Sequence, residues 1–282
     1  MNASYMSGMK MPQITDRAAL SRNRARAEPE ALFLQEHAAD ELQERLNEVN
    51  RTFKSVAIVT GFPRFWQDRF PDAKVITDTE TLDLSQGAHD LVIHAMSLHW
   101  ANDPVGQLVQ CRHALTPDGL LLCIFLGGQT LHELRASLAE AEANVTGGLS
   151  PRIAPMGEIR DLGGLLQRAG FALPVADSTH LTASYVNAFH LMHDLRKMGE
   201  NNALSDRIRH MTRRNVLTEA ACIYADNFRN DDNRVDATFE FITLTGWSPD
   251  ASQPQPLRPG SATARLADAL GTQETPLDRS ND

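Results

Sequence analysis

Short apolar runs, each closed by a turn-forming or polar residue, recur along the chain between stretches with helical spacing. β-Branched and aliphatic residues follow one another in these runs without polar alternation, which is typical of strands buried on both faces. Such strands occur in parallel sheets, where a helix joins each strand to the next. The clearest runs are Ser55–Thr60, Lys74–Thr77, Asp90–Ala95 and Leu120–Leu126. The pattern predicts an α/β fold with a parallel, doubly wound sheet.

The segment before the first strand predicts a long amphipathic helix. Apolar residues from Leu32 to Val49 recur at roughly helical spacing, and Pro29 is suited to the first turn of a helix. The charged residues between them, including Glu41, Glu44 and Arg45, are expected to face water. This helix is expected to pack against the edge of the sheet.

Several helix ends carry capping signals. Asp16 and Asp103 are expected as N-cap residues, and Gly170 as the residue that ends a helix. Thr130 and Glu133 have the spacing of a capping box for a helix over 131–143. The other expected elements are a turn at 116–119, strands near 179–185 and 238–245, and helices near 186–198 and 214–228.

Composition divides the chain into an N-terminal arm at 1–28, a domain at 29–248 and a C-terminal tail at 249–282. Residues 1–15 and most of the tail are expected to be disordered, apart from a short helix at 265–270. The arm contains Arg17, Arg22, Arg24 and Arg26. A solvated helix is the first interpretation of these arginines, and an arm that docks a partner is the second.

Charge and composition exclude several classes of function. The formal net charge of −9 argues against general nucleic-acid binding, which needs a clustered basic surface. No apolar run is long enough to predict a membrane span, and residues 1–13 lack the apolar core of a secretory signal, so the cytoplasm is expected. The three cysteines lie far apart without a CxxC pair, so neither a disulfide framework nor a zinc site is predicted.

Ligands of doubly wound sheets bind outside the carboxyl ends of the strands. In this chain those ends are Thr60–Gly61, Thr77–Asp78, Met96–Asp103 and Gly127–Thr130. Four separate strands are therefore expected to bring these segments to one rim.

Motifs at and beyond this rim resemble a known family. They are Leu98–Pro104 followed by Leu115–Gly119, Gly127–Arg135, Gly147–Arg152, Asp161–Gly163, Arg168–Phe171, Asp194–Asn201 and Thr245–Trp247. Together they resemble the class I methyltransferases, and in particular a branch of complex I assembly proteins related to the malonyl-carrier-protein methyltransferases of biotin synthesis. The resemblance implies a Rossmann-like sheet that binds S-adenosylmethionine, with additional C-terminal helices.

The first loop departs from the family pattern. A glycine-rich loop is implied there, because a Cβ atom would collide with the cofactor, but only Gly61 remains before Phe62 and Pro63. About 16 residues separate Gly61 from Asp78, too few for two βα units, so the cofactor half of the sheet is expected to be truncated. Asp78 then resembles either the family's third-strand acid, with the second strand deleted, or the second-strand acid, with the third strand lost.

The resemblance assigns the candidate cofactor-binding residues to the strand ends. They are Thr60, Gly61, Asp78, Thr79, Met96, His99 and Trp100. For Asp78, a turn-forming role is an equally good interpretation. For His99 and Trp100, a pair of packed side chains is an equally good interpretation. No catalytic residue is assigned, because methyl transfer requires chiefly the alignment of donor and acceptor.

Two functions remain open at this stage. One is an S-adenosylmethionine-dependent methyltransferase-like protein that modifies a protein or a carrier-linked substrate in the assembly of respiratory complex I. The other is a non-catalytic scaffold on the same fold, which binds a protein partner such as a complex I subunit. Arginine hydroxylation is linked to this branch, but the ten histidines form no His-x-Asp or His-x-Glu motif for iron. No Gly-x-Ser-x-Gly elbow supports a hydrolase.

Overall fold

The computed structural model describes residues 13–254, 267–268 and 271–272. Residues 1–249 form one compact unit and residues 250–282 a second. Residues 1–12, most of the segment expected to be disordered at the start of the arm, lie outside the described residues. So do most of the expected disordered tail and most of the expected helix at 265–270. Thr15, by contrast, is buried and forms a β-bridge with Leu204.

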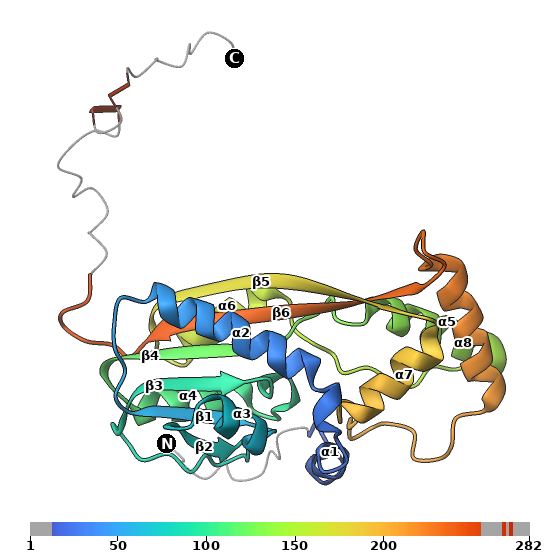
Figure 1. Ribbon diagram of the computed structural model, residues 1–282, viewed down its shortest axis with the longest axis horizontal. Helices are drawn as coiled ribbons and strands as arrows, with labels where there is room; N and C mark the ends of the chain where they lie inside the picture. Colours follow the sequence, from blue (N-terminus) through green and yellow to red (C-terminus); the bar gives the residue numbers. More distant parts are fainter. Residues whose placement is uncertain (1–12, 255–266, 269–270, 273–282) are drawn as a thin grey trace, which may run out of the picture. The chain divides into compact units, whose positions relative to one another are not determined.

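The first unit is built on a six-stranded sheet with the order β2-β1-β3-β4-β6-β5 (Figure 1). The strands are β1 Val56–Thr60, β2 Lys74–Thr77, β3 His89–Ala95, β4 Leu115–Leu126, β5 Ala172–Tyr185 and β6 Val235–Trp247. Strands β1 to β4 pair in parallel, so the expected α/β class is confirmed. The turn expected at 116–119 lies within β4, where Asp118 adopts a positive φ of 56°.

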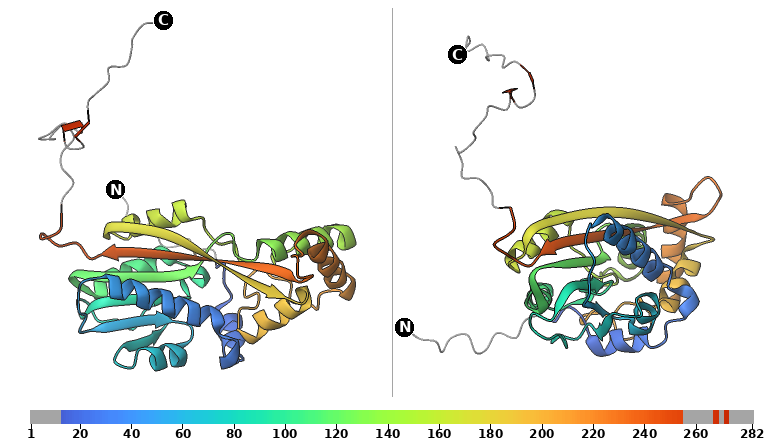
Figure 2. Two further views of the ribbon diagram at one scale, coloured as in Figure 1. Left: turned by 45° about the horizontal axis from the view of Figure 1, so that its top comes forward. Right: turned by 60° about the vertical axis from the view of Figure 1, so that its left-hand side comes forward.

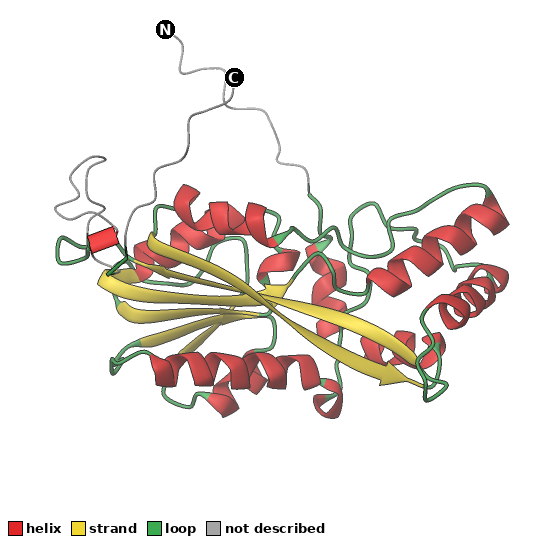
Figure 3. Ribbon diagram, turned by 90° about the horizontal axis from the view of Figure 1, so that it is seen from above, coloured by secondary structure: helices red, strands yellow, loops and turns green. Residues whose placement is uncertain are grey.

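The expectation of a wholly parallel sheet is wrong for β6, the only strand of the described sheet that runs against the others. Strand β6 pairs antiparallel with both β4 and β5. The burial pattern that predicts a strand contains no information about its direction, and a long helical connection between β5 and β6 is compatible with either direction. Strands β5 and β6 are long and twist past the ends of the shorter strands (Figure 3).

The sheet order decides which strand the truncated half retains. Strand β2, which ends immediately before Asp78, pairs directly with β1. In the doubly wound order 3-2-1-4-5-6 this is the place of the second strand. No strand among the described residues pairs with the outer edge of β2. Asp78 therefore corresponds in position to the second-strand acid, and the outermost strand is the one lost.

Helices cover both faces of the sheet (Figures 1 and 3). The strands supply alternate residues to two separate cores, because successive side chains point to opposite faces. One core contains Ile58 and Ile93 with α2 (Phe33–Glu48) and α3 (Pro63–Arg69). The other contains Val59 and Val92 with α4 (Pro104–Ala114) and α6 (Ile159–Arg168).

Helix α2 crosses the sheet face instead of turning all its charges to water. Arg45 forms ion pairs with Glu41 and Asp177, and Glu41 accepts hydrogen bonds from Thr179 and Thr243. The expectation that Glu41 and Arg45 are solvated is wrong, because β5 and β6 present polar groups to this helix. A 3-10 turn at Pro29–Ala31 precedes α2, as the position of Pro29 indicates.

The remaining helices gather where β5 and β6 extend past the other strands (Figures 1 and 2). They are α5 His132–Thr146, α7 Ala188–Lys197 and α8 Arg214–Asn227. The capping box expected for α5 is wrong. Thr130 exchanges hydrogen bonds with the backbone of Glu240, and Glu133 accepts hydrogen bonds from Thr238, so β6 uses both side chains.

The other expected caps are confirmed. Asp16 accepts a hydrogen bond from the amide of Ala19 at the start of α1 (Arg17–Arg24), and Asp103 does the same for Gly106 in α4. Gly170 follows α6 with a φ of +82°, a conformation that glycine adopts without strain.

Candidate functional site

The strand ends expected to converge do lie along one rim. Thr60 is in register with Thr77 of β2 and Ala95 of β3, and Ala95 is in register with Ile124 of β4. Asp78 lies one residue beyond this row and donates its amide to the carbonyl of Thr60. The parallel pairing of β1 to β4 thus produces the geometry that the sequence predicts.

Asp78 is the charged centre of the rim, and two arginines of α1 bind it. Arg24 Nη1 donates to Asp78 Oδ1 at 2.8 Å and to Oδ2 at 2.9 Å, and Arg17 Nη1 donates to Oδ2 at 3.2 Å. Arg17 also donates to the backbone carbonyl of Asp78. The side chains of Asp78 and Arg24 are only 5% and 8% exposed. The expectation of a solvated N-terminal helix is therefore wrong for these two arginines.

The environment of Asp78 favours its charged form. Burial alone would raise the pKa of its carboxyl, but the charges and hydrogen bonds of Arg24 and Arg17 outweigh burial and lower the pKa below the ordinary value of 3.8. Both carboxylate oxygens already accept hydrogen bonds from guanidinium groups. A ribose or adenine group would have to compete with two cations for this carboxylate.

The Arg24 guanidinium also occupies the space beside Gly61. A Cβ atom built on Gly61 would lie 2.1 Å from Arg24 Cζ, so a larger residue at this position would displace the guanidinium from its present place. Arg24 Cζ lies 5.7 Å from the centroid of the Phe62 ring. The one glycine left in the first loop thus makes room for a side chain of the same molecule.

A cavity of about 850 Å³, the rim cavity, remains between α1 and the ends of β1 and β2. Its lining includes Arg17, Ser21 and Arg24 from one side and Gly61, Phe65 and Asp78 from the other. Trp66 does not enter it, because its fully buried ring packs in the core and its Nε1 donates to Gln35. The aromatic residues of α3 therefore leave space at the rim, and the charged group that narrows it is Arg24.

His99 and Trp100 lie on a 3-10 turn (Leu98–Trp100) after β3, and Glu200 joins them. Trp100 Nε1 donates to Glu200 Oε2 at 2.8 Å, and His99 Nε2 lies 3.7 Å from the same oxygen. Burial alone would raise the pKa of Glu200, but His99, Arg24 and the Trp100 N–H outweigh burial and lower it. His99 and Trp100 are thus held by an acidic residue from a distant loop.

The other predicted residues have individual surroundings. Thr60 is buried and accepts a hydrogen bond from the amide of Phe62, whereas Thr79 is exposed and donates to the carbonyl of Thr81. Met96 is fully buried with a positive φ of 48°, which is uncommon for a non-glycine residue. No bound group tests their role, so their assignment as cofactor contacts stays a prediction.

Sequence reasoning missed Arg17, Arg24 and Glu200 as members of this site. Arg17 and Arg24 are seven residues apart, about two helical turns, and so share one face of α1. Glu200 belongs to the Asp194–Asn201 motif, whose Gly199 has a φ of +80° and lies against the Arg24 backbone. A Cβ on Gly199 would be 3.1 Å from Arg24 Cα, so this glycine allows α1 to approach closely.

These side chains, as arranged, do not fit S-adenosylmethionine. The carboxylate best placed to accept hydrogen bonds from a nucleoside is bound to Arg17 and Arg24, and the backbone beside Gly61 is covered by the same Arg24. Pro63 has no amide proton to offer at the start of α3. A cofactor could reach these groups only after Arg24 had moved.

The described residues contain no group of three or more His, Cys, Asp or Glu side chains that could hold a metal ion. None of the helices in the described part of the chain has the length and apolarity needed to cross a membrane.

Known proteins resemble this chain in sequence. A family model described as a methyltransferase domain matches residues 38–123. The human arginine-hydroxylase NDUFAF5, mitochondrial, is 38% identical over 202 residues, which cover 72% of this chain and 58% of that protein. Over the matched residues the chain is therefore similar to methyltransferases. A malonyl-[acyl-carrier protein] O-methyltransferase of Xylella fastidiosa is 34% identical over 64% of this chain and 58% of its own length.

Among solved structures, a putative methyltransferase from Bacillus halodurans has a TM-score of 0.48 and 13% identity, over 74% of this chain and 99% of that one. The chain spans less than three fifths of the length of the human and Xylella relatives. The sequence comparisons confirm the resemblance to the NDUFAF5 branch and to the malonyl-carrier-protein methyltransferases.

Proposed function

We propose that this methyltransferase-like protein serves the assembly of respiratory complex I by binding a protein partner, such as a complex I subunit, without using S-adenosylmethionine. The observation that carries the proposal is Arg24, which both pairs with Asp78 and covers Gly61. The relatives include a mitochondrial arginine hydroxylase, which supports a role connected with a protein substrate. The cytoplasm remains our proposed compartment.

The affinity of the protein for S-adenosylmethionine tests whether Arg24 blocks cofactor binding. Isothermal titration of the wild-type protein should give no binding heat at millimolar cofactor. Arg24→Ala opens the space beside Gly61 and releases Asp78 from its closest partner. If any variant binds S-adenosylmethionine, we expect this one to do so. Arg22→Ala is the matched control, since Arg22 is exposed on the same helix. Tight binding by the wild type, or cofactor-dependent methylation of any protein in an extract, would eliminate the scaffold.

A second candidate is S-adenosylmethionine-dependent modification of a protein or a carrier-linked substrate, with α1 displaced. Two observations favour it, namely the methyltransferase relatives and the rim cavity of about 850 Å³. Ligand sites of enzymes commonly have volumes in this range.

A genetic complementation experiment separates the two candidates. Ser21 is exposed and lines the rim cavity, so Ser21→Trp should fill the cavity while leaving the Arg24–Asp78 pair in place. In a deletion strain, native gels should show complex I restored equally by the wild type and by Ser21→Trp if the chain is a scaffold. Failure of a folded Ser21→Trp protein to restore it would favour the cofactor-dependent candidate.

A further inference from the structure

A second concave region lies beyond the rim, and its charge is opposite to that of the chain. This basic cleft of about 630 Å³ is lined by five cationic side chains but only one carboxylate, that of Glu28. The cations are Arg26, Arg152, Arg196, Lys197 and Arg207. In a chain of net charge −9, this excess of cations in one hollow of the surface is unusual.

Ion pairs fix part of this cleft and leave part of it available. Arg152 is held by Glu142 at 2.7 Å, and Arg207 is held by Asp16 at 3.0 Å. Within the described residues, Arg26 and Arg196 are exposed and form no ion pair. Lys197 pairs with Glu28 at 2.7 Å, so three of the five cations are neutralised by carboxylates. The two guanidinium groups of Arg26 and Arg196 remain available to bind a phosphate or a carboxylate.

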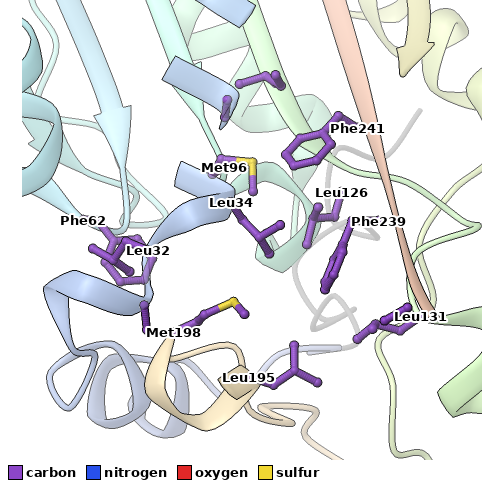
Figure 4. Packing of buried hydrophobic residues seen from close by; sticks show 14 of the residues in the cluster. Leu32, Leu34, Phe62, Met96, Leu126, Leu131, Leu195, Met198, Phe239 and Phe241 are labelled. Atoms are coloured by element: carbon purple, nitrogen blue, oxygen red, sulfur yellow. The ribbon is translucent and has the colours of Figure 1, made fainter. Parts of the chain in front are cut away.

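An apolar chamber of about 290 Å³ adjoins the basic cleft. Arg152, Asn201 and Asn202 line both spaces. Beyond these three residues most of the chamber lining is aliphatic or aromatic and comes from separate elements, including Leu34 of α2, Leu126 of β4, Leu138 of α5, Leu195 of α7 and Phe239 of β6. Figure 4 shows Leu34, Leu126, Leu195 and Phe239 around a common space.

The acid in the chamber wall determines the orientation of a ligand. Glu200 lines the chamber, and no donor among the described residues forms a hydrogen bond with its buried Oε1. A second anion beside it would be repelled and desolvated, whereas an apolar chain would meet mostly apolar walls. An anionic head is thus excluded from the chamber and attracted to the basic cleft.

We infer that the basic cleft and the apolar chamber form one binding site for an amphiphilic anion, namely an aliphatic chain that ends in a carboxylate or a phosphate. A cavity of about 150 Å³ holds benzene, so the chamber has room for about ten carbon atoms. This site is separate from the rim cavity, and its occupation does not depend on S-adenosylmethionine.

The requirements for an aliphatic chain and for an anionic head group are tested with four probes on the full-length protein, titrated calorimetrically below their micellar concentrations. Decanoate and decyl phosphate should bind. Decanol, which lacks the anion, should bind at least about tenfold more weakly, since one charged hydrogen bond alone is worth that factor. Inorganic phosphate, which lacks the chain, should also bind at least about tenfold more weakly, since two buried CH2 groups alone are worth that factor. Equal binding of decanol, or no binding of either anion, would overturn the inference.

Substitutions in the basic cleft and in the apolar chamber test where the probe binds. Arg196→Glu should weaken decyl phosphate binding about tenfold or more, and Leu138→Phe should weaken it by filling the chamber. Arg168→Glu is the matched control, because Arg168 is an exposed arginine of α6 outside both spaces, and it should bind as the wild type does. Wild-type affinity in both test variants would mean that the probe binds elsewhere and would overturn the site.

The same titration distinguishes two sources of the ligand. Decanoyl lysophosphatidic acid has the same chain as decanoate with a lipid phosphate head. Binding at least tenfold tighter than that of decanoate supports a lipid source, and the reverse order supports a free fatty acid. If Arg196→Glu leaves the affinities of both compounds unchanged, the basic cleft does not hold the head group and the inference fails.

Discussion

The two ends of the rim differ in how they are closed. Beside β1 and β2, the side chains of Arg17 and Arg24 reach Asp78 and fill the place next to Gly61 with charge. Beyond β4, where α5 and α7 cover the rim, an apolar chamber stays open beneath a basic cleft. The end of the rim that resembles a cofactor site is thus closed by two arginines of the same chain. The other end, which has no assigned role, contains an open chamber and, within the described residues, two arginines without an ion pair.

This difference shows that a retained motif does not by itself retain a site. Gly61 and Asp78 are both present at their strand ends, but each is now in contact with Arg24. A buried ion pair has a large desolvation cost, and it persists where both partners are fixed by further contacts. Here Gly199 allows α1 to approach, and Arg17 supplies a second cation.

The largest effect is expected from removing the charge of Asp78. Asp78→Asn leaves the buried Arg24 without its counter-charge, so the free energy of unfolding should fall by about 3 kcal/mol or more. Urea denaturation monitored by circular dichroism measures the change. Asp40→Asn is the matched control, because the Asp40–Arg69 pair is exposed and should contribute less than about 1 kcal/mol. Equal effects in the two variants would mean that the rim is not closed by a buried pair.

An intermediate effect should separate the open end of the rim from the packed core. Leu138→Phe adds volume where the chamber has space, so the free energy of unfolding should change by less than about 1 kcal/mol. Leu108→Phe makes the same change on α4, where the side chain is fully buried and lines neither the rim cavity nor the apolar chamber, and should cost about 1–3 kcal/mol. Denaturation midpoints compare the two. A cost for Leu138→Phe as large as that for Leu108→Phe would argue against the chamber.

The smallest effect is a pH dependence at the closed end. The folded protein holds the pKa of Asp78 below 3.8, so the stabilisation that this group provides is complete above pH 3.8 and is lost as the pH falls further. The Asp78→Asn variant lacks this contribution, and its stability should fall less steeply on acidification than that of the wild type. Thermal melting from pH 6 to pH 3 gives both slopes. Parallel slopes would show that Asp78 has an ordinary pKa in the folded protein.

Local patterns predicted the strands and their shared rim, because apolar runs and turn residues are properties of neighbouring positions. They did not predict the Arg24–Asp78 pair, whose members are 54 residues apart. The capping box at Thr130 was wrong for the same reason, since β6, about 110 residues later, takes the hydrogen bonds of Thr130. The antiparallel direction of β6 could not be predicted either, because a burial pattern contains no information about strand direction.

In this structure, Arg24 occupies the place that a nucleoside would need beside Gly61. A crystal structure of the full-length protein grown in millimolar S-adenosylmethionine tests it most directly. We expect density for the Arg24 guanidinium within hydrogen-bonding distance of both Asp78 oxygens, and none for a nucleoside. A ribose bound to Asp78, with Arg24 turned away from Gly61, would contradict the account.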